Sequence, residues 1–373
     1  MHDFDLDAER IKLARLLNVE EGELSFLASA HSSQLRQLRE GLSDAFYRRH
    51  QENYARLAKL SRVLPLGAAA KLAETVMGTV LGAGVSGEMD PERAARLAEK
   101  LSPKFLARLC IHMEPRRANN IITEIPKAVV VNVARELVAM GEYITLARFV
   151  TAISADTLHA VIEGVNDNAA LLRVGIFVEE RDTLSRLLEQ VSDLRRRALM
   201  QAATDGDLWP QTLVLLTHLS DKMKGMMGDV TVDLGETVMA KVAHVTREHS
   251  LWEPWMLSVA NMQASNRQQV MAMSALLTDG LLTDWLAEND NERLWALTLR
   301  LWQDAPAALL DACFAKLAQQ PAWLAGLLQE VHVAGLGGGL KGLLERLSPE
   351  VRAQFEAVAQ RDYADDFAAV TGA

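Results

Sequence analysis

A short capping signature recurs along the chain and constrains the fold more than any other feature. It consists of an apolar residue, then Ser or Pro, then an amphipathic stretch of about ten residues. Ser accepts a hydrogen bond from a free amide at a helix start, and Pro loses nothing at the first helical position. The signature occurs at Leu101–Pro103, Ile125–Pro126, Ile153–Ser154, Val191–Ser192 and, more distantly, Leu347–Pro349. Each occurrence predicts the start of a short helix.

Almost the whole sequence has helical periodicity. Phe105, Leu106, Leu109 and Met113, for example, fall on one helical stripe. The strand-like runs are Val129–Val131, which helical flanks favour as helix, and Asp229–Leu234, which is a strand or an ordered loop. Short amphipathic helices cannot bury their apolar faces alone and therefore stack on their neighbours. We expect an all-α, α-solenoid-like fold, a right- or left-handed superhelix of short stacked helices.

Composition changes near residue 205. Residues 1–205 carry a net charge of −1, and residues 206–373 carry −9 together with all seven tryptophans. A second break is expected at Gly82–Pro91, where Asp90 can cap a helix that begins at Pro91. The sequence thus predicts an N-terminal helical lead-in (1–90), a helical-repeat region (91–205) and an acidic, Trp/Met-rich helical domain (206–373).

The middle region resembles the cytosolic N-terminal domain of MgtE-type magnesium transporters, a superhelix similar to the middle part of the flagellar switch protein FliG. The resemblance covers about residues 101–203. It is carried by Leu101–Leu109, Met113–Ala118, Ile121–Pro126, Val133–Leu137 and Gly141–Val150. It implies stacked short helices. Nothing in the sequence resembles the regulatory nucleotide-domain pair or the membrane helices of the transporters, so transport is not implied. Their acidic magnesium ligands match no position here, so no metal site is implied.

Several function classes are disfavoured. A net charge of −10 argues against a nucleic-acid binder held by phosphate contacts. Two cysteines, Cys110 and Cys313, form neither a disulfide framework nor a zinc module. No stretch approaches the roughly 20 apolar residues of a membrane span, and the acidic start lacks the apolar core of a secretory signal. We therefore expect a cytoplasmic protein without a membrane span.

No catalytic, cofactor or metal set is predicted. His244 and His249, with Glu248, are five residues apart, whereas zinc pairs on one helix prefer three or four. The Gly-rich run Gly335–Lys341 fails the phosphate-loop pattern, because Leu340 replaces the glycine before the lysine and Gly342 follows it. A flexible hinge ahead of the last helices is the favoured interpretation of that run.

Two groups of residues are candidates for partner or ligand binding. Met and Trp can line an adaptable apolar groove or fill an irregular helical core, and core is the favoured alternative. The part around Lys222–Gly228 is expected to be the most exposed. Basic residues of the middle region form either a positive patch for an acidic partner or a solvated face. The candidates are Met223, Met226, Met227, Trp252, Trp255, Arg108, Arg116 and Arg117.

The leading hypothesis is a non-enzymatic helical-repeat protein that acts as a protein-interaction scaffold or regulatory adaptor. The alternative is a binding protein for a small apolar or amphipathic ligand in the Met/Trp-rich C-terminal half. An enzyme of unrecognised type, using His244, Glu248 and His249, is a third hypothesis. A protein partner is expected, no cofactor is, and self-association through uncapped solenoid ends is left open.

Overall fold

The computed structural model describes residues 4–179 and 181–371. This part of the chain contains 25 α-helices, two 3-10 segments and one π segment, and no strand. The all-α prediction is therefore confirmed, including the helical interpretation of Val129–Val131, which lies in α8 (Lys127–Ala139). The contacts divide the chain into two compact units, Met1–Val191 and Ser192–Ala373.

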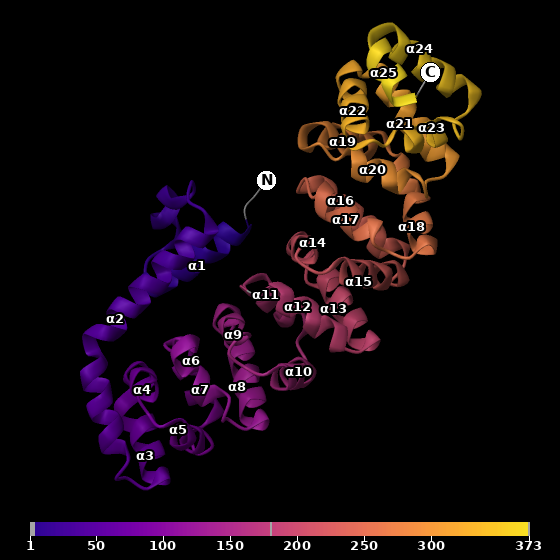
Figure 1. Ribbon diagram of the computed structural model, residues 1–373. Helices are drawn as coiled ribbons and strands as arrows, with labels where there is room; N and C mark the ends of the chain where they lie inside the picture. Colours follow the sequence, from indigo (N-terminus) through magenta and orange to yellow (C-terminus); the bar gives the residue numbers. More distant parts are fainter. Residues whose placement is uncertain (1–3, 180, 372–373) are drawn as a thin grey trace. The chain divides into compact units, whose positions relative to one another are not determined.

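The N-terminal unit consists of thirteen short segments and one long helix, α2 (Figure 1). They are α1 (Phe4–Leu17), η1 (Glu21–Leu27), α2 (Ser32–Ser61), α3 (Leu66–Leu72), η2 (Ala73–Met77), α4 (Gly78–Ser86), α5 (Pro91–Ala98), α6 (Pro103–Ile111), α7 (Pro115–Ile122), α8, α9 (Tyr143–Phe149), α10 (Ala155–Gly164), α11 (Asn168–Ile176) and α12 (Arg181–Gln190).

Helices in this unit pack mainly on the helix two places along the chain. One row runs α2, α4, α6, α8, α10, α12, and a second runs α3, α5, α7. Helices α9 and α11 pack on each other in the same way, and α1 packs on α2. This pairing buries the apolar stripe of each short helix between two neighbours, as the sequence periodicity requires.

Predicted helix caps are observed in several places. The side chains of Asp90, Ser102, Ser154 and Ser192 each accept a hydrogen bond from the backbone amide three residues ahead. Ser348 makes no such side-chain bond; its amide instead donates to Asp311 Oδ1. Local capping chemistry therefore sets most of these helix starts.

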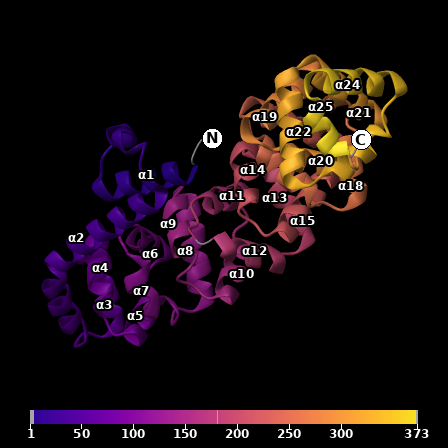
Figure 2. The same cartoon turned by 45° about the horizontal axis from the view of Figure 1, so that its top comes forward.

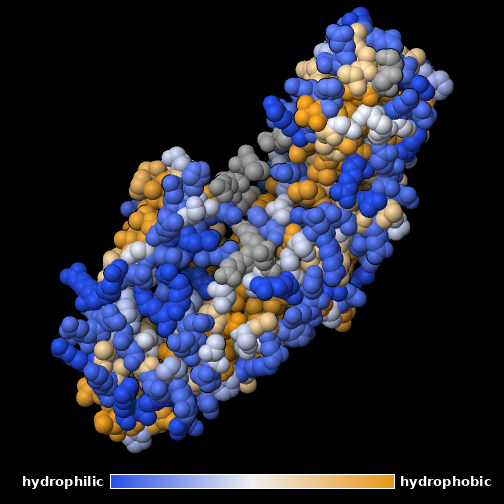
Figure 3. Space-filling view, viewed as in Figure 1, coloured by the Kyte–Doolittle hydropathy of each residue, from blue (hydrophilic) through white to orange (hydrophobic). Residues whose placement is uncertain are grey.

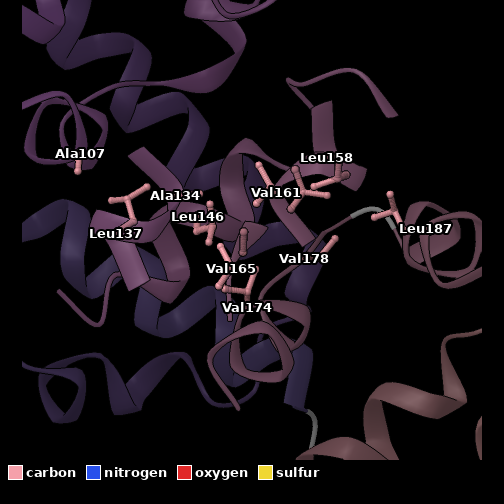
Figure 4. Close-up of a cluster of buried hydrophobic side chains, with 12 residues drawn as sticks. Ala107, Ala134, Leu137, Leu146, Leu158, Val161, Val165, Val174, Val178 and Leu187 are labelled. Carbon is pink, nitrogen blue, oxygen red and sulfur yellow. The ribbon is translucent and has the colours of Figure 1, made fainter. Parts of the chain in front are cut away.

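A core cluster of the N-terminal unit lies between α6 and α12 (Figure 4). Leu137 from α8, Leu146 from α9 and Val161 from α10 are all buried there. Val165 and Val174 extend the cluster to α11, and Leu187 to α12. A separate cluster, formed by Leu6, Leu13, Ala14, Leu24 and Leu35, joins α1 to η1 and α2. The first two helices thus carry a small core of their own.

Figure 2 shows helices of the C-terminal unit from a second direction. The order and spacing of its helices follow a three-helix repeat. Its elements are α13 (Asp193–Asp205), α14 (Trp209–Thr217), α15 (Asp221–Asp233), α16 (Glu236–Glu248), α17 (Trp252–Ala260), α18 (Ala264–Met271), η3 (Ser274–Leu277), α19 (Asp279–Glu292), α20 (Trp295–Trp302), α21 (Ala307–Gln319), α22 (Pro321–Ala334), α23 (Gly337–Leu344), α24 (Pro349–Asp362) and α25 (Ala364–Thr371). The first helices of the four repeats, α14, α17, α20 and α23, begin 43, 43 and 42 residues apart.

Each repeat begins at the same backbone corner. Asp207, Ser250, Arg293 and Gly335 all have positive φ, between 50° and 67°. The amide of the residue that follows donates to the carbonyl five residues earlier in all four corners, for example Leu251 N to Thr246 O at 2.8 Å. This is the Schellman arrangement, which ends one helix and starts the next at a fixed angle.

Tryptophans and methionines fill the centre of the C-terminal unit. Trp252 stacks on Trp285 with ring centroids 6.2 Å apart, and contacts between neighbouring rings continue through Trp302 and Phe314 to Phe355 and Phe367. Met256 is fully buried, and its sulfur lies 3.2 Å from Trp285 Nε1. The Met/Trp-rich stretch is therefore predominantly core.

Several predicted boundaries and segments differ from the structure. The unit boundary lies at residue 191, ahead of α13, and the predicted boundary at 205 is the end of that helix. Residues 82–86 belong to α4, which packs on α2 and α6, so they are not a linker. The run Asp229–Leu234 is no strand, because residues 229–233 complete α15, where Thr231 and Val232 are buried.

The Gly-rich run Gly335–Lys341 also differs from the predicted flexible hinge. Gly335 caps α22, and Gly337 begins α23. A Cβ atom at Gly337 would lie 2.1 Å from the carbonyl oxygen of Val370 in α25. This glycine thus permits a close helix contact, which contradicts the predicted hinge.

Candidate functional site

The predicted Met and Trp candidates lie mostly inside the core of the C-terminal unit. Met223 and Met227 are 0% and 1% exposed, so the expected exposure of Lys222–Gly228 is wrong for them. Trp252 and Trp255 are 2% and 3% exposed. Met226 is half-buried. Close packing explains this: a Cβ at Gly225 would lie 1.9 Å from the carbonyl oxygen of Asn261, so α15 and the end of α17 approach directly.

The predicted arginines lie in the N-terminal unit, and two of them are engaged within it. Arg116 Nη1 lies 3.1 Å from Glu40 Oε2, and Arg117 pairs with Asp44. The Arg117 guanidinium also lies 4.2 Å from the centroid of the Tyr47 ring. The acidic partner of this pair of arginines is therefore α2 of the same unit. Arg108 is exposed on α6.

The other chemical candidates form no reactive set. His244 Nε2 lies 3.7 Å from Glu248 Oε2, both exposed. Among residues 4–179 and 181–371, no three His, Cys, Asp or Glu side chains are placed to hold a metal ion. Burial raises the pKa of the Cys110 thiol to about 12 and also raises that of Cys313, which opposes thiolate formation.

The N-terminal unit has a shallow hollow around Tyr47, Glu88 and Arg117 and two deeper ones, which α4 separates. Gly82, Val85 and Ser86 face one of the two deeper hollows, whereas Ala83, Gly84 and Gly87 face the other. We call the first the apolar pocket and the second the polar cavity. Sequence patterns did not indicate either one, because each is a space between helices distant in the chain.

The polar cavity has a volume of about 920 Å³ and lies among α1, α2, α4, α7 and α9. Its wall includes five lysine and arginine side chains, and each has an acidic partner: Lys12 with Glu9 and Glu179, Arg15 with Glu142, Arg39 with Glu9 and Glu179, Arg117 with Asp44, and Arg148 with Glu114. The wall therefore presents balanced charge, and these ion pairs hold α1 and α2 against the rest of the unit.

Glu179 pairs with Lys12 and Arg39, the two most buried cationic side chains of that wall. Lys12 Nζ donates to Glu9 Oε1 at 2.8 Å and to Glu179 Oε1 at 2.9 Å. Arg39 Nη2 also donates to Glu179 Oε1, at 2.8 Å. Burial alone would raise the pKa of Glu179, but the positive charges of Lys12 and Arg39 lower it below its ordinary value. This carboxylate stays ionised and links α1 and α2 to the turn after α11.

The apolar pocket has a volume of about 210 Å³ and lies among α2, α3, η2, α4, α5, α6 and α7. Small side chains leave this space open, because Ala69, Ala73, Gly82, Ala94 and Ala98 stand where larger apolar residues would fill it. The rest of its wall is almost entirely apolar: Leu57, Leu60, Leu64, Leu72, Met77, Val85, Met89, Leu97, Leu101, Phe105, Leu106, Leu109, Met113, Ile121 and Ile125.

The only two hydroxyl groups on the described pocket wall have local partners. Ser61 Oγ donates to Ala58 O at 2.7 Å, and Ser86 Oγ donates to Ala83 O at 2.8 Å. The same wall carries no ionisable group for acid–base chemistry. Such a pocket can bind apolar groups through burial of their surface.

Two leucines form the rim of the apolar pocket. Leu60 at the end of α2 is 63% exposed, and Leu72 at the end of α3 is 40% exposed, and both line the pocket. Apolar surface is visible where α3 lies, at one end of the N-terminal unit (Figure 3). Val63 and Val76, from the same stretch of chain, are 81% and 74% exposed. Surface of this kind is typical of binding sites.

Hydrogen bonds made by side chains outside the wall fix the segments that surround the pocket. Arg93 of α5 donates from Nη2 to the carbonyl oxygens of Ser61 and Leu64, at 2.5 and 2.7 Å. Glu74, within the π segment η2, accepts from the amide and hydroxyl of Ser102, both at 2.7 Å. The hydrogen bond from the Ser102 backbone amide, and to a lesser degree the one from its hydroxyl, lowers the pKa of Glu74. These bonds fix the end of α2 and the start of α6 around the pocket.

The comparisons with known proteins give no independent assignment of either hollow. No family model, curated protein or solved structure matches the chain. No helix in the described part of the chain is long and apolar enough to cross a bilayer.

Proposed function

We propose that this protein is a non-enzymatic helical-repeat adaptor that binds another protein through the apolar pocket of its N-terminal unit. One observation carries the proposal: an almost wholly apolar pocket has two partly exposed leucines, Leu60 and Leu72, on its rim. Contiguous exposed apolar surface, especially beside a recess, often marks an interaction site.

The volume of the pocket favours a protein partner. About 210 Å³ is below the roughly 300–1,000 Å³ of typical small-molecule sites. It is close to the engineered cavity of about 150 Å³ that accepts one benzene molecule. One large apolar side chain of a partner helix would fill it, as anchor residues do at the centre of protein interfaces.

The repeat architecture supports the same proposal. Arrays of two- or three-helix units with a period of about 40–47 residues present extended surfaces to partners. The 42–43-residue period of the C-terminal unit lies in that range. The C-terminal unit would then serve as a rigid body, since its Trp and Met side chains are used internally.

A small apolar ligand is the second candidate, and the composition of the pocket wall favours it. A wall with only two hydroxyls offers little to orient a polar ligand but would hold a short aliphatic or aromatic group. This candidate moves the ligand site from the Met/Trp-rich half to the N-terminal unit. A thermal-shift screen with small hydrocarbons and short-chain acids separates it from the first.

The test of the leading proposal is site-specific photo-crosslinking in the cell that makes the protein. A photoreactive residue at Leu72 should capture one protein through a defined segment, identified by mass spectrometry. The matched control is the same residue at Leu194, which is 80% exposed on α13 of the other unit. No protein captured at position 72 beyond those captured at 194 would reject the proposal.

A further inference from the structure

We propose that the helix received by the apolar pocket is acidic, an inference that rests on the proposed function. The chain carries a net charge of −10, yet residues 53–73, which lie between Glu52 and Glu74 and supply part of the pocket rim, include four basic residues and no acidic one. These are Arg56, Lys59, Arg62 and Lys71, and all four are exposed. This segment of the rim therefore has the opposite sign to the molecule as a whole.

The basic residues stand next to the rim in sequence. Lys59 precedes Leu60 and Lys71 precedes Leu72, so each lysine is attached to the backbone next to a rim leucine. Lysines can bury their methylene stems along apolar surface and keep the ammonium in water. A partner helix whose apolar face enters the pocket would place its polar flanks against these ammonium groups, where acidic residues are favoured.

Helix stability alone does not account for this pattern. Lys59 and Lys71 lie in the last turns of α2 and α3, where one positive charge interacts favourably with the helix dipole. Acidic residues elsewhere on an exposed surface would leave that effect intact. The four exposed basic residues of this segment exceed what the two helix ends need, and an acidic partner accounts for the excess.

An anionic membrane is the other surface that basic and apolar residues could attract. Peripheral membrane binding uses side chains that project from one helix face. Here the rim leucines come from two helices, α2 and α3, and border a recess of about 210 Å³. A recess bounded by two helices suits the anchor side chain of a third helix better than a flat lipid surface.

The test measures binding of three labelled peptides to the full chain by fluorescence anisotropy. Each is about 18 residues long, five helical turns, with the same apolar face of Leu and one central Phe. The first peptide has Glu on its polar face, the second has Lys, and the third has Glu with the Phe replaced by Ala. Vesicles containing phosphatidylserine form a fourth arm.

We expect the acidic peptide with Phe to bind at least about 10-fold more tightly than either of the others, with affinity falling as salt rises. The double variant Lys59→Glu/Lys71→Glu should lose that preference. Arg48→Glu/Arg49→Glu is the matched control, because those residues lie about 15 Å further along α2, beyond the screening length of roughly 8 Å at physiological salt. Circular dichroism melts verify that both variants fold.

Equal or weaker binding of the acidic peptide than of the basic one would overturn the inference. So would binding of vesicles with no binding of the acidic peptide. Crosslinking at Leu72 distinguishes failure of the acidic-partner inference from failure of the proposed function. A captured segment that is neutral or basic would reject only the acidic partner, whereas no captured protein would reject the proposed function itself.

Discussion

The ammonium of Lys12 lies 2.9 Å from a carboxylate oxygen of Glu179, although 167 residues separate them in the sequence. Arg39 of α2 contacts the same carboxylate, so one acidic side chain joins both N-terminal helices to the turn after α11. The side chains of Lys12 and Arg39 are only 3% and 6% exposed. This cluster therefore holds α1 and α2 against the turn after α11, beside the polar cavity.

Glu179→Ala should therefore destabilise the N-terminal unit. Removing one partner of a buried ion pair costs about 3–5 kcal/mol, and the 23% exposure of Glu179 lowers our expectation to about 2 kcal/mol. Urea unfolding followed by circular dichroism measures the loss. All seven tryptophans lie in the C-terminal unit, so the tryptophan fluorescence transition should stay unchanged.

Glu52→Ala is the control for that experiment. Glu52 forms an exposed pair with Arg56, with side-chain exposures of 90% and 73%, and such pairs contribute less than about 1 kcal/mol. An equal effect of Glu52→Ala and Glu179→Ala would contradict the role given to Glu179.

The same carboxylate makes stability depend on pH. The folded-state pKa of Glu179 lies below its ordinary value of 4.5. The stabilisation it provides is therefore complete above the unfolded pKa and is lost as the pH falls through the lower folded pKa. The stability difference between wild type and Glu179→Gln should be constant from pH 7 to about 5.5 and shrink below about 4.5. Urea titrations at several pH values measure it, and a difference that grows in acid would refute this assignment.

The Gly-rich run gives a paired test of backbone strain. Gly335 has φ +67°, and a Cβ atom added at Gly335 or at Gly338 would meet no other atom within 4 Å. Gly335→Ala should cost about 1–2 kcal/mol, because the left-handed region disfavours Ala. Gly338→Ala, inside α23, should instead stabilise by up to about 1 kcal/mol. Thermal unfolding followed by tryptophan fluorescence compares the two variants. Two effects of the same sign would contradict the left-handed turn at Gly335 that ends α22.

Gly84 tests the contact between α2 and α4. A Cβ there would lie 2.5 Å from the ring of Tyr54. Gly84→Ala should destabilise by about 1–3 kcal/mol through overpacking. In a Tyr54→Ala background the clash is absent, and Gly84→Ala should become neutral or stabilising because Ala favours helix. A double-mutant cycle by circular dichroism measures this coupling, and a coupling of zero would exclude the contact.

Two buried alanines distinguish the apolar pocket from the close-packed core. Ala98 lines the pocket, whereas Ala107 lies in the core cluster at 0% exposure. Ala98→Leu should leave stability unchanged or raise it slightly, because the added carbons enter the pocket. Ala107→Leu should cost about 1–3 kcal/mol through overpacking. Urea unfolding compares the variants, and a loss at Ala98 as large as at Ala107 would argue against an open pocket.

Local structure was the part most accessible from sequence. The caps at Asp90, Ser102 and Ser154 were predicted correctly because each depends on residues within one helical turn. The fold class followed from the same local signals. The period of 43 residues was also present, as Trp209, Trp252 and Trp295, but Gly337 occupies the fourth position and the Ser/Pro intervals concealed it.

The exposure of individual side chains and the presence of the pocket were harder to predict from the sequence. The side-chain chemistry of Met223 and Trp252 suits a groove and a core equally, and only packing decides between them. The apolar pocket arises from alanines on α3 and α5 and a glycine on α4, residues with no chemical signature of their own. A space formed by missing volume between separate helices leaves no pattern in one sequence.

Calorimetric titration with the partner segment captured at Leu72, made as a synthetic peptide, tests the central claim most directly. Ala98→Leu fills the pocket from inside, whereas Leu194→Ala changes an exposed leucine of the other unit. The account predicts that Ala98→Leu weakens binding by about 30-fold, the effect of losing one anchor residue, and that Leu194→Ala leaves it unchanged. Unchanged affinity in a folded Ala98→Leu variant would contradict the account.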